Sequence, residues 1–480
     1  MAGRAIENTD PVPLVVDVDG TLIRSDLLIE AVCRLVATRP FVALRLPLWA
    51  LRGRGALKSA IADRVTVDPS SLPLVDELVA YVRAERAAGR PVYLASASDR
   101  RQVEALASHL GLFDGVFGSD ATGNLKGSRK ADRLVHEFGE GGFDYAGDAP
   151  ADLAVWKRAR KAIAVNCGRG TRRALGRSHQ DIVEIAPRRT RFLDYLRAIR
   201  VHQWAKNGLL LLPMLTSHAI DLTNLALVGL GIVAFSLVAS SVYLTNDLLD
   251  LPADRDHATK RRRPLASGAV PILHGLLLAP VFLLAGMGMA TLVSPAFLGV
   301  VLLYFVATLA YSLVLKRQPV VDVLTLAGLY TLRAIAGGAA IGITLSAWLL
   351  AFSMFLFLCL ALVKRHTELK SRQDAGKGDP RGRGYRLADI PVLESLAAAA
   401  GYAAVVVLAL YVNSDAVVEL YARPWGLWLA CVLLLYWVSR VLLITHRGEM
   451  NDDPVVFALK DRTSVLVVLL VVLVALTAAL

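Results

Sequence analysis

The sequence has few cysteines for its length, and none form a closely spaced pair. Four occur in 480 residues, and two of them lie within apolar runs: Cys33, Cys167, Cys359 and Cys431. Zinc modules and disulfide frameworks need closely spaced or regularly paired cysteines. We therefore exclude both classes and expect buried free thiols.

The first ten residues lack the apolar core of a secretory signal peptide. Arg4, Glu7 and Asp10 interrupt this stretch, whereas a signal peptide contains an apolar segment of about 7–15 residues. We therefore expect the N-terminal part of the chain to stay in the cytoplasm.

Acidic residues are outnumbered by basic ones. The chain has 53 Lys and Arg against 41 Asp and Glu, a formal net charge of +12, 55 % hydrophobic residues and a mean hydropathy of +0.50. This composition excludes a disordered chain and indicates membrane spans. An excess of Lys and Arg is typical of proteins that bind nucleic acid, anionic lipid or phosphorylated substrates.

The chain changes character near residue 200. Before it, short strand-like runs at 13–18, 91–95, 144–146 and 162–165 alternate with helical patterns, which predicts an α/β fold with a parallel sheet between helices. The stretch 168–191 is rich in Arg and Ser, which is typical of a linker. We expect an α/β domain over 1–170, a linker over 171–199 and a membrane domain over 200–480.

Apolar runs of membrane-spanning length follow one another after residue 200. A helix needs about 20 apolar residues to cross a bilayer, and nine segments approach this length, the first being the shortest. They cover about 207–220, 223–246, 272–292, 295–315, 319–343, 345–363, 393–413, 425–445 and 463–480. We therefore predict an all-α membrane bundle of nine transmembrane helices.

Basic residues gather in alternate loops between these segments. With the N-terminus inside, the inside loops contain the cluster 260–263 and the eight Lys and Arg of 364–386, whereas the outside loops contain only Arg423. This asymmetry follows the positive-inside rule and predicts an inner or plasma membrane protein with a cytoplasmic N-terminal domain. Because the basic residues lie at membrane edges and not in an aromatic-rich patch, we expect no nucleic-acid partner.

Two carboxylates end the first expected strand. In VVDVDGT, residues 15–21, alternation places Asp17 and Asp19 on one side at the carboxyl edge of the sheet, where α/β folds bind ligands. One carboxylate can attack phosphorus while the other handles the leaving-group proton. Further polar residues follow in order at strand ends and in one basic segment: Ser96, Lys126, Lys130, Asp148 and Asp152.

These pieces together resemble the haloacid dehalogenase (HAD) superfamily of phosphatases over about residues 10–170. The resemblance implies a Rossmann-like sheet with a helical cap at about 25–88, Asp17 as nucleophile and Asp19 as general acid and base. It implies Mg²⁺ held among Asp17, Asp19, Asp148 and Asp152, and phosphate bound by Ser96 and by Lys126 or Lys130. The alternative is an inactive scaffold, but no catalytic residue type is missing.

Within the expected cap, residues 41–52 combine apolar positions and a tryptophan with interleaved arginines. Such a segment would lie on a membrane surface or pack within the cap or against the other domain. The sequence favours neither interpretation.

A cluster of carboxylates follows the second full span. Asp247, Asp250 and Asp254 have the spacing of one helical face, and Lys260 and Arg263 come directly after them. Carboxylates at a membrane edge are costly unless they hold cations, and Mg²⁺ bridges carboxylates to phosphate oxygens. The pattern therefore predicts a Mg²⁺–diphosphate site and not a solvated acidic loop.

The stretch 246–264, NDxxDxxxDxxHxxKxxRP, resembles the first signature of the UbiA superfamily of intramembrane prenyltransferases, and the likeness extends over about 190–480. It implies a helical bundle around a central cavity. Asp247, Asp250 and Asp254 would be catalytic and hold Mg²⁺ on a diphosphate donor, which Asn246, Lys260 and Arg263 would contact.

Four segments resemble one branch of that superfamily, the decaprenyl-phosphate phosphoribosyltransferases. They are the extended signature, HQWAKN at 202–207, LRAIAGG at 332–338 and KRxxEL at 364–369. The branch implies transfer of phosphoribose from phosphoribosyl pyrophosphate (PRPP) to a polyprenyl phosphate. The anionic groups of these substrates would be bound by Lys206, Arg333, Lys364, Arg365 and Glu368.

Several alternatives stay open. Arg333 lies within a span and would pair with Asp322 or with a substrate phosphate, whereas Lys206, Lys364 and Arg365 would equally suit topology anchors. The chain would otherwise be a prenyltransferase that uses prenyl diphosphate and an aromatic or other acceptor, or a membrane anchor for the HAD domain. In the main hypothesis the HAD domain removes the 5-phosphate of the product. A homo-oligomer is compatible with all three.

Overall fold

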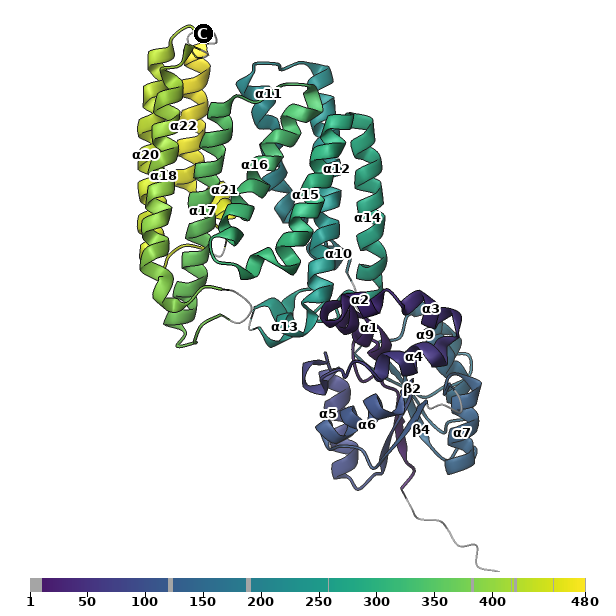
Figure 1. Ribbon diagram of the computed structural model, residues 1–480. Coiled ribbons are helices and arrows are strands. Elements are labelled where there is room, and N and C mark those ends of the chain that lie inside the picture. Colours follow the sequence, from purple (N-terminus) through teal and green to yellow (C-terminus); the bar gives the residue numbers. More distant parts are fainter. Residues whose placement is uncertain are drawn as a thin grey trace, which may run out of the picture. The chain divides into compact units, whose positions relative to one another are not determined.

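The computed structural model of the protein describes residues 11–479 except 120–123, 187–190, 258, 381–383, 416, 418–420 and 452. Residues 1–10, where we predict no signal peptide, lie outside the described residues. The chain forms two compact units, Met1–Arg200 with Tyr243–Pro280 and Val201–Val242 with Val281–Leu480. Each unit is described by itself (Figure 1).

A six-stranded parallel sheet of order β3-β2-β1-β4-β5-β6 organises the N-terminal domain (Figure 1). Its central strand β1 pairs with both β2 and β4, with Leu14 opposite Val92 and Asp144. The α/β prediction is confirmed. The strands are β1 (Leu14–Val16), β2 (Val92–Asp99), β3 (Gly115–Ser119), β4 (Asp144–Gly147), β5 (Ala162–Val165) and β6 (Ile182–Ile185).

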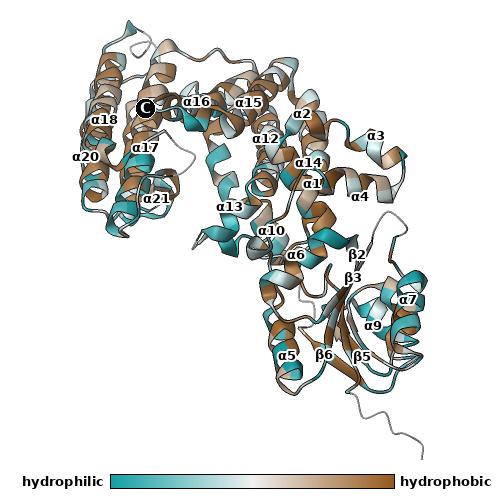
Figure 2. Cartoon of the chain, turned by 60° about the horizontal axis from the view of Figure 1, so that its bottom comes forward, coloured by the Kyte–Doolittle hydropathy of each residue, from teal (hydrophilic) through white to brown (hydrophobic). Residues whose placement is uncertain are grey.

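Helices cover both faces of this sheet, as Figures 1 and 2 show. One face carries α5 (Asp76–Ala87) and α6 (Arg100–Leu110). The other carries α7 (Ser128–Phe138), α8 (Leu153–Trp156) and α9 (Arg169–Leu175). Because parallel strands are buried on both sides, β1 is a continuous apolar run with no exposed residue.

The cap is smaller than the predicted 25–88. Its helices are α1 (Leu27–Thr38), α2 (Pro40–Ala43), α3 (Leu46–Leu51) and α4 (Arg54–Ala62), which pack around Trp49. The short η1 (Pro69–Ser71) leads to α5. The α5 helix buries Leu78, Val79 and Val82 against the strands, so it belongs to the core of the domain.

The stretch predicted as a linker contains ordered elements. Along its whole length β6 pairs with β5, so the sheet extends to Ile185, and α10 (Phe192–Ala198) follows. In β6 only Ile185 is buried and Glu184 is exposed, so this edge strand lacks the buried apolar run that marked the equally short β5, and the sequence pattern missed it.

In the part of the chain that the structure describes, eight helices are long and apolar enough to cross a membrane, and Figure 2 colours them mostly brown. They are α12 (Leu222–Leu249), α14 (Ile272–Val293), α15 (Pro295–Leu313), α16 (Val321–Ile341), α17 (Ala347–Asp374), α18 (Ile390–Val412), α20 (Trp428–His446) and α22 (Arg462–Ala479). The predicted helical membrane domain is confirmed, with one fewer long helix.

The missing ninth span is the first one, 207–220. This stretch folds as the 3₁₀ segment η3 (Val201–Leu211) and the short helix α11 (Leu212–Thr216). Pro213 cannot donate a backbone hydrogen bond and therefore starts a new helix. Short elements also connect the long helices: α13 (Leu251–Asp256), η4 (Lys260–Arg262), η5 (Leu315–Arg317), η6 (Leu387–Asp389), η7 (Pro424–Leu427) and α21 (Pro454–Lys460).

A buried aspartate with two arginine partners ties β4 into the N-terminal domain. Asp144, which is 1 % exposed, accepts hydrogen bonds from Nε and Nη2 of Arg160 at 2.9 and 2.8 Å, and Arg90 also donates to it. Burial alone would raise the pKa of Asp144, but Arg160 and Arg90 outweigh burial and hold this pKa below its usual value. The stabilisation is therefore present above the unfolded-state pKa near 4 and is lost as the pH falls.

Replacing Asp144 with asparagine is expected to lower the free energy of unfolding of this domain by about 2–3 kcal/mol, because two guanidinium groups lose a buried anion. Amide hydrogen exchange of β4 and β5 in the full-length protein measures the effect. The matched control is Asp132→Asn, which breaks the exposed pair with Arg158 and should cost less than about 0.5 kcal/mol. Equal protection in both variants would contradict the prediction.

Candidate active sites

The end of β1 carries the first predicted pair of carboxylates. The Asp17 amide extends the ladder by donating to the Ala146 carbonyl at 2.9 Å, and the Asp17 side chain is 7 % exposed. Asp19 lies beyond it, and its Oδ1 accepts from the Leu27 amide at 2.8 Å. The other oxygen of Asp19 accepts from the hydroxyl groups of Ser96 and Ser98 at 3.0 and 2.7 Å. Ser96, expected to bind phosphate, thus holds Asp19 in place.

Of the two candidate lysines, the structure brings Lys130 to Asp17. Its Nζ donates to Asp17 Oδ1 at 2.9 Å and to the Tyr145 hydroxyl at 2.8 Å. Asp17 and Asp152 outweigh the burial that would lower the pKa of Lys130, so this pKa lies above its ordinary value and the ammonium stays charged. Lys126 is exposed before α7.

Tyr145 is a site residue that the sequence pattern missed. It lies on β4, and its hydroxyl donates to Asp152 Oδ1 at 2.8 Å while accepting from Lys130. Tyr145 lies on the strand directly before the Asp148–Asp152 motif, and this position in the sequence could have identified it as a site residue.

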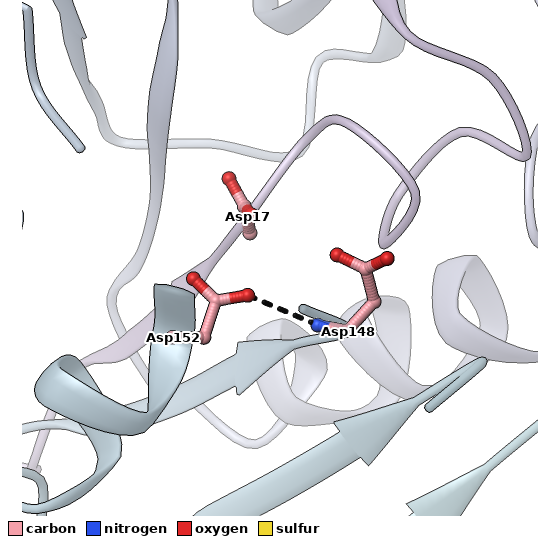
Figure 3. Close-up of side chains that lie close together, drawn as sticks. All are labelled: Asp17, Asp148 and Asp152. Carbon is pink, nitrogen blue, oxygen red and sulfur yellow. Dashed lines mark hydrogen bonds between the residues drawn. The ribbon is translucent and has the colours of Figure 1, made fainter. Parts of the chain in front are cut away.

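Three carboxylates form a cluster that suits a divalent cation. Asp17, Asp148 and Asp152 each offer an oxygen, and these atoms lie within 4.8 Å of one another (Figure 3). Asp152 Oδ2 also accepts from the Asp148 amide at 3.2 Å, the contact dashed in Figure 3. Burial raises the pKa of Asp148 to about 7, and the Asp152 charge adds to this effect. A bound cation would relieve both costs, so the residues fit Mg²⁺. Asp19 is outside this cluster.

Gly20 is required where the chain turns beside this cluster. Its φ is +79°, and a Cβ built on it would lie 2.3 Å from Asp148 Oδ2. An alanine would therefore push the Asp148 carboxylate out of the cluster as well as strain the backbone.

Gly20→Ala is expected to reduce the apparent Mg²⁺ affinity and the phosphatase activity of the domain by at least about tenfold each. Gly89→Ala is the matched control, because Gly89 has a φ of +82° and a Cβ at this position would meet no atom within 4 Å. It carries the same backbone strain without the clash. Magnesium titration of hydrolysis distinguishes the two, and equal losses in both variants would attribute the effect to strain alone.

The second predicted site begins at the end of α12. Asp247 lies in the last turn of α12, Asp250 lies between the helices and Asp254 lies in α13, so a break at Asp250 interrupts the expected continuous helix. Asp247 and Asp254 are each 3 % exposed, whereas Asn246, Asp250 and Lys260 are half-buried.

Arg263 lies between the two buried carboxylates. Its Nη1 donates to Asp247 Oδ1 at 3.0 Å and to Asp254 Oδ2 at 2.6 Å, and Arg200 donates to Asp247 at 2.5 Å. Arg200 was missed because it precedes the motif by almost fifty residues. Among the described residues, the aspartates of this motif do not gather around a single point as Asp17, Asp148 and Asp152 do. A guanidinium occupies the position between the carboxylates.

In the second unit, Lys206 contacts an aspartate that sequence reasoning missed. Lys206, 7 % exposed, pairs with Asp453, the N-cap residue of α21. Burial would raise the pKa of Asp453, but Lys206 and Lys364 outweigh it and keep this pKa low. The acidic NDDP sequence at 451–454 was the available signal.

Arg333 is held inside the bundle by polar and aromatic side chains. It donates to Asn207 Oδ1 at 3.0 Å and to the Tyr304 hydroxyl at 3.1 Å, and it lies 5.0 Å from the Tyr330 ring centroid. Asp322 instead accepts from Arg365 Nε at 2.5 Å. The expected Arg333–Asp322 pair is therefore wrong, because eleven helical residues separate the two Cα atoms by about 16 Å.

Arg365 and Glu368, both predicted to bind substrate, contact each other. Arg365 is 1 % exposed, pairs with Glu368 and Asp322, and donates to the Tyr311 hydroxyl at 2.9 Å. Tyr385 adds a hydrogen bond to Asp322 at 2.6 Å. These contacts of Arg365 join α17 to α15 and α16.

Comparisons with known proteins identify the families that the two parts of the chain resemble. The profile of the UbiA prenyltransferase family matches residues 209–460, and that of haloacid dehalogenase-like hydrolases matches residues 14–157. The uncharacterized protein y4nM of Sinorhizobium fredii is 39 % identical over 456 residues, which are 94 % of this chain and 88 % of that protein. Nodulation protein NoeC of Azorhizobium caulinodans is 36 % identical over 279 residues, 58 % of this chain and 91 % of that protein.

A third relative is the decaprenyl-phosphate phosphoribosyltransferase of Mycobacterium tuberculosis. It is 39 % identical over 186 residues, which are 38 % of this chain and 62 % of that protein. The match therefore covers only part of either chain. Because the first profile spans more than half of the sequence and contains seven of the eight long apolar helices of the described residues, the chain belongs to the UbiA prenyltransferase family, with a haloacid dehalogenase-like domain in its N-terminal part.

Proposed function

We propose that the membrane domain transfers phosphoribose from PRPP to a polyprenyl phosphate and requires Mg²⁺. The observation that carries the proposal is the presence of basic residues beside aspartates that are themselves buried or half-buried. Arg200 and Arg263 pair with Asp247, and Lys206 pairs with Asp453, whose pKa the charge of Lys364 also lowers. PRPP and a lipid phosphate bring three phosphate-bearing groups, which need more cations than a single prenyl diphosphate. The partial similarity to a decaprenyl-phosphate phosphoribosyltransferase supports the same donor.

Asp247, Asp250 and Asp254 would hold Mg²⁺, which neutralises charge on the donor diphosphate. Arg263 bridges Asp247 and Asp254 in this structure. Together with Lys260 it would stabilise the leaving pyrophosphate. The bond between ribose C1 and the diphosphate oxygen breaks, and an oxygen of the lipid phosphate bonds to C1. This nucleophile is already anionic, so no strong general base is needed.

The HAD-like domain is proposed to hydrolyse a phosphate monoester, with the 5-phosphate of the transferase product as substrate. Asp17 attacks phosphorus, and Asp19, held by Ser96 and Ser98, protonates the departing alkoxide. Asp19 then takes a proton from the water that hydrolyses the aspartyl phosphate. Lys130 fixes Asp17 and would bind a phosphate oxygen. Mg²⁺ at Asp17, Asp148 and Asp152 would neutralise the phosphate.

Donor choice tests the transferase proposal. Membranes that contain the full-length protein, Mg²⁺ and decaprenyl phosphate are given labelled PRPP or labelled prenyl diphosphate. We expect lipid-phase label from PRPP alone. Label from prenyl diphosphate alone, with an aromatic acceptor, would establish the prenyltransferase alternative. Label from neither, together with retained phosphatase activity, would support an anchored phosphatase. The expected cytoplasmic position of both sites is tested by protease access in sealed inverted vesicles.

A further inference from the structure

The cap exposes a row of large apolar side chains. Phe41, Leu44, Leu48 and Leu51 of the α2–α3 segment are 86, 76, 60 and 84 % exposed. Their spacing of three, four and three residues places them on one side of a helical path. An exposed apolar row of this kind on a charged α/β domain marks an interaction surface.

The tryptophan of this segment belongs to the interior of the cap. Trp49 is 9 % exposed, packs in the cluster with Ile61 and lies beneath the Arg64 guanidinium, 4.8 Å from it. Packing of the cap therefore fixes α3 through Trp49 and leaves the apolar row on the other side. The row is not needed to complete the core of the cap.

The same part of the cap is strongly basic. Between Glu30 and Asp63 the sequence contains six Lys and Arg and no acidic residue. Arg39, Arg45 and Arg52 flank the apolar row and are exposed. An apolar row flanked by arginines is the pattern of a helix that lies in the membrane interface, where anionic headgroups attract the cations.

We propose that the cap segment Pro40–Leu51 docks on the anionic phospholipid surface of a bilayer. Phe41, Leu44, Leu48 and Leu51 enter the boundary between headgroups and acyl chains, and the flanking arginines bind lipid phosphates. A second copy of the chain fits less well, because a two-fold contact would set these arginines against one another. The long apolar helices of the same chain place it at a membrane, so the cap is tethered to a bilayer.

Photo-crosslinking in the full-length protein tests the docking. A photo-reactive amino acid replaces Leu48 in one variant and Arg133 of α7, a 52 %-exposed position outside the cap, in the control. Both variants are reconstituted into vesicles of phosphatidylcholine and phosphatidylglycerol and irradiated. We expect at least about tenfold more lipid adducts at position 48 than at position 133. Adducts with a second chain, with the protein's own membrane helices, or at neither position would each overturn the proposal.

The charge requirement is tested in the same system. Adducts at position 48 should fall severalfold when phosphatidylglycerol is omitted, because the lipid then carries no net negative charge. They should fall by a similar factor when Arg45→Gln and Arg52→Gln are introduced, because the protein then loses the cations that attract anionic lipid. An unchanged yield would refute anionic recognition. Labelling at Phe41 repeats the experiment if the Leu48 variant fails to give the wild-type proteolysis pattern.

Discussion

Asp17→Asn is expected to reduce phosphate monoester hydrolysis by the HAD-like domain by about a thousandfold or more, because an amide cannot act as the nucleophile. Asp17 also contributes an oxygen to the cluster with Asp148 and Asp152, so the variant should bind Mg²⁺ more weakly. The measurement is Mg²⁺-dependent hydrolysis of p-nitrophenyl phosphate by the purified full-length protein.

A control at an exposed residue and a second active-site variant accompany this measurement. Asp132→Asn, at an exposed ion pair, should retain full activity. Asp19→Asn leaves the Lys130–Asp17 pair intact and should also lose at least about a hundredfold, because the proton donor is removed. Hydrolysis by Asp17→Asn within tenfold of wild type would exclude Asp17 as the nucleophile.

Asp247→Asn is expected to lower lipid-linked transfer by at least about a hundredfold, because the metal-binding charge at the diphosphate is lost. The amide would leave Arg200 and Arg263 facing one anion fewer. Incorporation of labelled PRPP into lipid is measured over a Mg²⁺ titration, and the residual activity should need more Mg²⁺.

Asp256→Asn is the matched control for this variant. Asp256 lies in α13 close to Asp254 but is exposed, so its replacement should leave transfer within about twofold of wild type. If Asp247→Asn behaved like Asp256→Asn, the assignment of the aspartates to a metal–diphosphate site would be wrong.

Sequence patterns predicted the elements that bury continuous apolar runs. The strands β1 and β5 are such runs, and β2 and β4 contain shorter ones, whereas β3 contains Gly115 and Gly118 and β6 contains Glu184 at the sheet edge. A pattern of hydrophobicity cannot detect pairing with a neighbouring strand, so both elements needed the structure.

Spacing alone could not choose between Lys126 and Lys130. The structure starts α7 at Ser128, so Lys130 turns inward with Ala131 and Leu134 while Lys126 precedes the helix. Contacts between distant segments, such as Lys206 with Asp453, leave no trace in local spacing. The Arg333–Asp322 pairing was wrong for a reason available in the sequence, since the rise of one helix keeps these residues apart.

The mass of the lipid product tests the central claim, transfer of phosphoribose followed by removal of its 5-phosphate. Membranes with the wild-type protein, Asp17→Asn or Asp247→Asn are incubated with PRPP, Mg²⁺ and decaprenyl phosphate, and the lipids are analysed by mass spectrometry. We expect a ribosyl lipid from wild type, a phosphoribosyl lipid from Asp17→Asn and neither from Asp247→Asn. A phosphoribosyl lipid that persists equally in wild type and Asp17→Asn would contradict the coupling, and no sugar-bearing lipid from any protein would contradict the transferase.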